Sequence, residues 1–178
     1  YGTPEESLTY KFAMANRKDF GVVPYVTDKD YVVNSYHVDP RENIDAFTKL
    51  EIEGEYLALS AGGAVSYVET LDLSHNKEAI ISIIQWMHEH IVYAEFNRKI
   101  GVCYQCGYEG DIELTKTTDG DFVFTCPCCG NQDDSKMNVV GRLCGYLGQI
   151  SSGNTNKGRL DDIYHREIHL DCVEEATL

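Results

Sequence analysis

Two Cys-x2-Cys motifs constrain the fold of this chain more than any other feature of its sequence. Each motif is followed by a glycine. Two intervening residues let both thiolates of a motif face one ion, and the glycine lets the backbone fold back towards the sulfur atoms without a Cβ clash. The sequence therefore predicts one tetrahedral metal site, with zinc as the expected ion and four thiolate ligands: Cys103, Cys106, Cys126 and Cys129.

The residues between the motifs complete a small metal-binding ribbon. Residues 112–116 and 122–124 are predicted to form a hairpin that brings the two motifs together. A closed shell of four cysteines leaves no coordination position for a substrate, so we expect the site to be structural. Cys128 breaks the two-residue spacing and is not expected to be a ligand. Iron also suits four thiolates, and the Cys-Gly-Tyr and Cys-Pro-x-Cys-Gly patterns resemble rubredoxin, so a one-iron electron carrier is an alternative.

The charge of the chain argues against a nucleic-acid-binding ribbon. The formal net charge is −14 and the isoelectric point is about 4.7. Recognition of nucleic acid depends on clustered Lys and Arg, so we expect no nucleic acid partner. Between the outer cysteines the ribbon carries a single lysine, Lys116, against the carboxylates of Glu109, Asp111, Glu113, Asp119 and Asp121.

Cysteine usage and hydropathy indicate the compartment. Seven cysteines, an odd number, with two Cys-x2-Cys pairs indicate metal ligation in a reducing cytoplasm rather than a disulfide framework. No stretch approaches the ~18 to 20 apolar residues needed to cross a bilayer, so no membrane span is expected. The chain begins without Met, and its first residues enter a helix. We therefore expect a piece of a longer protein.

The first third of the chain alternates between predicted helices and strands. Thr3-Pro4 with Glu6 predicts a helix to about Lys18, which Gly21 ends. Residues 31–38 are rich in Tyr and Val and predict a strand. Asp39-Pro40 is expected to open the next helix. One side of that helix carries Ile44, Phe47 and Leu50.

The alternation continues to residue 97. After Gly62-Gly63, residues 64–71 predict a strand. The helix that follows is expected to be capped by Ser74 or Asn76. Residues 91–96 could form a further strand. Strands and helices in this order are typical of a parallel sheet or barrel. Trp86, His88 and His90 are expected to pack or to face solvent. The buried face of the helix is predicted to carry Ile80, Ile84, Met87 and Ile91, widened by Ile81 and Ile83.

A glycine-rich loop follows the cysteine motifs. Residues 141–148 read Gly-Arg-Leu-Cys-Gly-Tyr-Leu-Gly, and a lone glycine pattern is most often a tight turn. The loop lacks the lysine and hydroxyl residue of a phosphate-binding loop. The run Arg-x-Cys-Gly-Tyr-Leu-Gly resembles the glycyl radical motif of anaerobic (class III) ribonucleotide reductases, in which a four-cysteine zinc site also lies shortly upstream. Residues 3–6, 9–13, 34–35 and 62–63 resemble this family as well.

The resemblance spans nearly all 178 residues but only the C-terminal portion of the family's chain. It implies an α/β fold with three parts. Residues 1–97 would be the C-terminal part of a ten-stranded α/β barrel of the glycyl radical enzyme type, and residues 98–135 the zinc ribbon. Residues 136–178 would hold the glycyl radical loop and a C-terminal tail that we expect to be loop-rich.

The resemblance also implies the chemistry. Gly145 would store a glycyl radical that an activating enzyme generates with S-adenosylmethionine and an iron–sulfur cluster. The radical would pass to a cysteine in the N-terminal remainder of the reductase. The resulting thiyl would take the 3′ hydrogen of a ribonucleoside triphosphate, whose 2′ hydroxyl leaves as water, and formate or a dithiol would supply the reducing equivalents. The complete enzyme would be an oxygen-sensitive, cytoplasmic homodimer.

The remaining motif residues have smaller expected roles. None of the seven cysteines matches the thiyl position, so we expect the isolated chain to be inactive. Arg142 and Tyr146 are expected to shape the loop and Cys144 to pack beside Gly145, while Cys172 is expected to have no role.

Two further interpretations stay open. Asn34 and Ser35 either approach the substrate or pack at a strand end. The loop is also similar to that of other glycyl radical enzymes such as formate acetyltransferase, which generally lack the cysteine ribbon. The alternative of a different class is a non-catalytic, rubredoxin-like metal-binding module for electron transfer.

Overall fold

The computed structural model describes residues 4–33, 36–74, 76–143 and 146–169 of the chain. These residues form two compact units that interleave along the sequence. The first, called here the ribbon unit, comprises Tyr1–Val32 and Lys99–His165. The second, called the β-α-β unit, comprises Val33–Arg98 and Arg166–Leu178. The mixed α/β class predicted from the sequence is confirmed.

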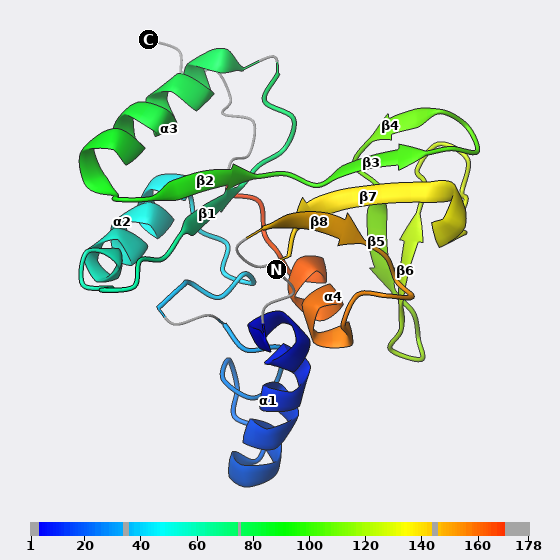
Figure 1. Cartoon of the computed structure of the whole chain (residues 1–178), viewed down its shortest axis with the longest axis horizontal. Coiled ribbons are helices and arrows are strands. Elements are labelled where there is room, and N and C mark those ends of the chain that lie inside the picture. Colours follow the sequence, from blue (N-terminus) through cyan, green and yellow to red (C-terminus); the bar gives the residue numbers. More distant parts are fainter. Residues whose placement is uncertain (1–3, 34–35, 75, 144–145, 170–178) are drawn as a thin grey trace. The chain divides into compact units, whose positions relative to one another are not determined.

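The β-α-β unit contains two helices and a parallel pair of strands. Strands β1 (Ser66–Glu69) and β2 (Ala94–Asn97) run side by side, and α3 (Lys77–His90) connects them, as Figure 1 shows. Helix α2 (Ala46–Leu57) packs on α3 and β1. These elements confirm the predicted strand–helix–strand order. The core of the unit is formed by Ala46, Leu50, Val68, Ile83 and Met87.

The predicted start of α2 is wrong. Asp39-Pro40 forms a turn, closed by the Glu42 N–H that donates to the Asp39 carbonyl at 2.9 Å. The helix begins later because Asp45 is its N-cap, and the Asp45 side chain accepts hydrogen bonds from the N–H groups of Phe47 and Thr48. A capping carboxylate, rather than the proline, sets the boundary.

The strand predicted over residues 31–38 is also wrong, since residues 31–33 and 36–38 form no strand. Side chains occupy the backbone donors that a neighbouring strand would need. The Val32 N–H donates to the Thr9 hydroxyl at 3.1 Å, and the Val38 N–H donates to the Glu53 carboxylate at 3.0 Å. Tyr31 is fully buried, and the other described residues of the segment are half-buried.

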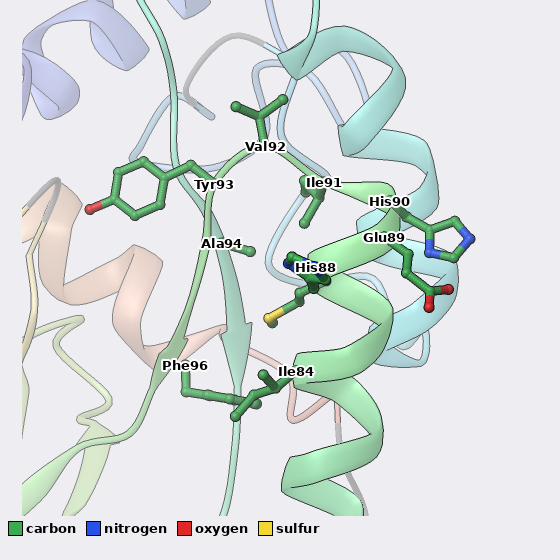
Figure 2. Close-up of a pocket in the computed structure, with 10 residues that line it drawn as sticks. Ile84, His88, Glu89, His90, Ile91, Val92, Tyr93, Ala94 and Phe96 are labelled. Atoms are coloured by element: carbon green, nitrogen blue, oxygen red, sulfur yellow. The ribbon is translucent and has the colours of Figure 1, made fainter.

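Helix α3 begins at the predicted cap, Asn76, and its buried face confirms part of the predicted one. Ile83 and Met87 are buried, whereas Ile84 is 50% exposed and Ile81 is 54% exposed. Ile84 lines an open groove of about 780 Å³ between the end of α3 and β2, shown in Figure 2. The groove is also lined by His88, Ile91, Val92, Tyr93 and Phe96.

The ribbon unit is built on an antiparallel sheet with the strand order β4-β3-β7-β8. Its strands are β3 (Ile100–Cys103), β4 (Tyr108–Gly110), β7 (Met137–Arg142) and β8 (Leu147–Ile150). The predicted hairpin is confirmed as β5 (Glu113–Lys116) paired with β6 (Phe122–Thr125). A short 3-10 turn, η1 (Asp134–Lys136), precedes β7.

Two helices complete the ribbon unit. Helix α1 (Pro4–Phe20) confirms the predicted first helix, and Gly21, at a φ of +73°, ends it with an N–H donated to the Arg17 carbonyl. Helix α4 (Lys157–Tyr164) packs on α1. Strands β7 and β8 with α4 correct the prediction that residues 136–178 are loop-rich. Across the described residues, none of the helices has the length and apolarity to cross a membrane.

Candidate metal centre and glycine loop

The four predicted ligands converge in the ribbon unit. Their sulfur atoms all lie within 4.8 Å of one another. The Sγ atoms of Cys103 and Cys129 are 3.7 Å apart, as are those of Cys106 and Cys126. A tetrahedral zinc ion with bonds of about 2.3 Å to sulfur separates its ligands by about 3.8 Å. The donor set and its spacing therefore fit a metal ion with four thiolates.

Matching backbone turns present the two pairs of ligands. The Gly107 N–H donates to the Cys103 carbonyl at 2.8 Å, and the Gly130 N–H donates to the Cys126 carbonyl at 2.9 Å. Gly107 has a φ of +75° and Gly130 a φ of +70°. Residues with a Cβ rarely adopt this conformation. Glycine is therefore favoured by the backbone conformation and not, as predicted, by the avoidance of a Cβ clash, since nothing lies within 4 Å of a Cβ at either position.

Electrostatics within the cluster favour a cation. Burial is the largest single effect on Cys103 and raises its pKa, but the N–H groups of Cys106 and Gln105 and the neighbouring thiols lower the pKa to about 7. The Tyr108 N–H lowers the pKa of Cys106, yet burial and the other three thiols raise it above the ordinary value. Four thiolates this close repel one another, so a bound cation stabilises their deprotonated forms.

Two side chains that are not predicted ligands support the cluster, and sequence reasoning missed both. The Asn131 amide, which is buried, lies 3.8 Å from the Cys103 sulfur and donates to it. The Gln105 amide lies 4.0 Å from the Cys129 sulfur. The Asn131 carbonyl also accepts the Cys126 N–H at 2.9 Å. Such groups orient metal ligands, and the only signal in the sequence is that Asn131 follows the second glycine.

The other predicted site residues lie away from this cluster or outside the described residues. Cys128 is exposed, which agrees with its predicted role as a bystander. Cys144 and Gly145 lie outside the described residues. The same holds for Asn34 and Ser35 and for Cys172.

The glycine loop connects β7 and β8, which pair as an antiparallel hairpin (Figure 1). Arg142 faces Leu147 in the register, and the Leu143 N–H donates to the Tyr146 carbonyl at 3.0 Å. Gly141 and Gly148 face each other one step further from the turn. The described residues on both sides of residues 144–145 are therefore fixed by the hairpin.

The metal centre and the hairpin share one core. Leu143 and Ile150 of the hairpin belong to the same buried cluster as Cys103 and Cys126. In addition, β3, which ends at Cys103, is hydrogen-bonded along β7, the first strand of the hairpin. The ribbon unit thus joins a four-thiol centre and a glycine hairpin in one packed structure.

These features define a class of protein: a mixed α/β chain with a four-cysteine ribbon that can hold a metal ion and that supports a glycine-rich hairpin. The sequence model of one family, described as anaerobic ribonucleoside-triphosphate reductase, matches residues 1–169. The chain belongs to this family.

Individual relatives agree. The chain is 37% identical over 170 residues to the anaerobic ribonucleoside-triphosphate reductase of Escherichia coli (strain K12), which covers 96% of the chain and 23% of that relative. It is 37% identical over 169 residues to the enzyme of Enterobacteria phage T4, covering 95% of the chain and 27% of the relative. The chain thus spans about a quarter of the length of these relatives.

Solved structures show the same fold. A structure of an anaerobic ribonucleotide reductase matches 93% of the chain with a TM-score of 0.62 and 22% identity, over 24% of that structure's chain. A structure of the anaerobic ribonucleotide reductase from Thermotoga maritima, with MES in the active site, matches 85% of the chain with a TM-score of 0.55 and 23% identity, over 22% of its length.

Proposed function

We propose that this chain is the C-terminal portion of an anaerobic ribonucleotide reductase, which converts ribonucleoside triphosphates to 2′-deoxyribonucleoside triphosphates by glycyl and thiyl radical chemistry. The observation that supports this most is the joint presence of the four-thiol cluster and the glycine hairpin in one core. The family match over residues 1–169 sets aside the alternative of a rubredoxin-like electron carrier.

The metal in this proposal is a structural zinc ion bound by the four sulfur atoms of the cluster. A zinc ion has no redox chemistry and its four thiolate positions are filled, so it cross-links the two knuckles. The residues that hold it are Cys103, Cys106, Cys126 and Cys129. Zinc in this position stabilises the strand β3, against which β7 is paired.

Gly145 is the proposed site of the radical. A glycine Cα radical can become planar and delocalise over both flanking amides, because no side chain shields or twists it. The activating enzyme, which uses S-adenosylmethionine, abstracts the hydrogen atom from this Cα. The paired residues Arg142 and Leu147 form the base of the hairpin on the two sides of the proposed radical site.

The chain acts in this proposal only with the rest of the reductase. The thiyl cysteine, the other barrel strands and the nucleotide-sensing region belong to that remainder, and the complete enzyme is a cytoplasmic homodimer. The proposed division of the chain is a barrel part over residues 1–97, the zinc ribbon over 98–135, and the radical loop with its tail over 136–178.

The test is turnover by the complete reductase that carries this segment. Under anaerobic conditions, with the activating enzyme and S-adenosylmethionine, the unmodified protein is expected to form deoxyribonucleoside triphosphates. Gly145→Ala is expected to abolish product because a side chain removes the radical site, while Gly153→Ala, at a position with open space, is expected to keep activity. Normal product formation by Gly145→Ala would refute the proposal.

A further inference from the structure

The glycine hairpin turns one face towards the core of the ribbon unit. Burial alternates along β7, as expected for a strand whose successive side chains point to opposite faces of the sheet. On the core face, Leu143 is 6% exposed and Ile150 is 2% exposed. Gly141 and Gly148 lie between these two large side chains and face each other in register. A pair of glycines thus separates the two apolar residues.

Each of the two large side chains occupies the space over one glycine. A Cβ at Gly148 would lie 2.7 Å from Cδ1 of Leu143 and 3.3 Å from Cε2 of Tyr146. A Cβ at Gly141 would lie 2.9 Å from Cδ1 of Ile150. Carbon atoms in favourable contact are about 3.5 to 4.0 Å apart. Neither position therefore accepts a side chain while Leu143 and Ile150 stay in place.

The two glycines differ in which residues they contact. Leu143 and Tyr146 are the described residues on either side of residues 144–145, and the Leu143 N–H donates to the Tyr146 carbonyl at 3.0 Å. Leu143 belongs to the buried cluster of the ribbon unit, and Tyr146 packs against that cluster. Of the two facing glycines, Gly148 is therefore the one that contacts both residues flanking the proposed radical site.

We propose that Gly148 is a positioning residue for the radical site, because its missing side chain leaves the space into which Leu143 and Tyr146 pack. This inference rests on the proposed function. A methyl group at residue 148 would have to move Cδ1 of Leu143 by about 0.7 Å to restore ordinary van der Waals contact. Leu143 is buried and stands two positions before Gly145, so its displacement shifts one end of the segment that carries the radical. Reactions between positioned groups are sensitive to errors of about 1 Å.

Hydrogen exchange in the complete reductase tests the packing without using radical chemistry. Gly148→Ala is expected to speed exchange of the Leu143 amide about tenfold, because the hydrogen bond from this amide to the Tyr146 carbonyl opens more often. Leu143→Val removes the δ carbon atoms. The double variant Gly148→Ala/Leu143→Val is therefore expected to exchange within about twofold of the unmodified protein, as neighbouring sites that share one contact do not act additively.

The facing glycine supplies the matched control. Gly141→Ala places a methyl group on the same face and in the same register, but against Ile150. Ile150→Val is expected to relieve the effect of Gly141→Ala on exchange, and Leu143→Val is expected not to relieve it. Equal relief of both alanine variants by Leu143→Val would overturn the proposal, because the effect would then be a general loosening of the hairpin.

Turnover per radical tests the positioning role itself. Gly148→Ala is expected to bind one zinc ion per chain and to form glycyl radical within about twofold of the normal yield, with turnover per radical about tenfold lower and an unchanged KM. Division by the amount of radical leaves out molecules that did not fold or were not activated. A merely structural role would lower radical and product together and leave their ratio unchanged. Leu143→Val is expected to restore the ratio in the double variant.

Each outcome decides between the alternatives. Normal turnover per radical in Gly148→Ala would overturn this proposal alone, and so would a double variant whose exchange recovers while its turnover per radical stays low. If Gly148→Ala does not fold, the double variant carries the test, and its failure to fold would also overturn the proposal. If the unmodified reductase forms no glycyl radical, the proposed function fails and the positioning role fails with it.

Discussion

Cys103 and Met137 face each other in antiparallel register across β3 and β7. One is a ligand of the candidate metal centre, and the other begins the strand that leads into the glycine hairpin. The Tyr104 N–H, next along the chain, donates to the Lys136 carbonyl at 2.8 Å and extends this pairing into the first knuckle. Paired backbone therefore connects the metal centre with the strand that leads to the base of the hairpin.

Replacing a buried ligand is expected to remove metal and radical together. Cys126→Ser leaves three thiolates and disrupts the core that Leu143 shares, so both zinc content and glycyl radical yield should fall to near zero. Metal analysis with an absorption spectrum checks the first, because zinc thiolates are colourless and a ferric site is red. Electron paramagnetic resonance checks the second.

The exposed Cys128 supplies the control for that experiment. Cys128→Ser is expected to retain one metal ion per chain and the normal radical yield. A metal-free Cys126→Ser protein with normal radical yield would show that the metal centre does not support the loop.

The glycine of the second knuckle is expected to tolerate asparagine better than alanine. Gly130 has a φ of +70° and open space around it, so a Cβ at this position meets no clash. The left-handed backbone conformation is nevertheless unfavourable for alanine, and Gly130→Ala is expected to destabilise the knuckle by about 1 to 2 kcal/mol. Asparagine enters this conformation more readily. Competition with a chelator measures the metal affinity of both variants, and equal affinities for Ala and Asn would contradict the backbone argument.

A different glycine is required for packing. A Cβ on Gly158 would clash with the Asp30 carbonyl and lie 3.0 Å from the Tyr10 Cα. Backbone atoms cannot swing aside, so Gly158→Ala is expected to separate α4 from α1 and to destabilise the ribbon unit by about 2 to 3 kcal/mol. Hydrogen exchange of the α4 amides measures this. Gly153→Ala is the control, and similar exchange in both variants would refute the packing role.

The buried His169 makes stability depend on pH. Burial and the positive charge of Lys49 lower its pKa to about 4, against an ordinary value of 6.5. The folded state thus binds this proton less readily than the unfolded state. Its stabilising effect is complete above pH 6.5 and is lost as the pH falls towards 4, by about 3 kcal/mol in full.

An NMR titration of the imidazole tests this directly. A midpoint near 4 is expected. A midpoint near 6.5 for His169 would mean that its ring is not held at Glu69 as the 2.9 Å hydrogen bond indicates.

Local signals made much of the metal site predictable from the sequence. The spacing of the cysteines and the glycines after them determine the knuckle turns within a few residues, and Asn76 caps α3 as expected. Asn131 was beyond such reasoning, because its contact with Cys103 joins residues 28 positions apart.

The errors share a physical cause. In residues 31–38, β-forming side chains predict a strand, but Thr9 and Glu53 capture the backbone donors. In β7 and β8 the glycines suggested loops, whereas Gly141 and Gly148 face each other and leave room for Ile150 and Leu143. Contacts with other parts of the fold determine the backbone conformation of these segments, and a single sequence does not reveal such contacts.

The central claim is that Gly145 carries the radical, and oxygen tests it most directly. The complete reductase is activated without oxygen, its radical signal is recorded, and air is then admitted before mass spectrometry. A glycyl radical is cleaved by oxygen at its own position, so we expect an organic radical signal followed by chains truncated at Gly145. Intact chains, with no radical signal beforehand, would contradict the account.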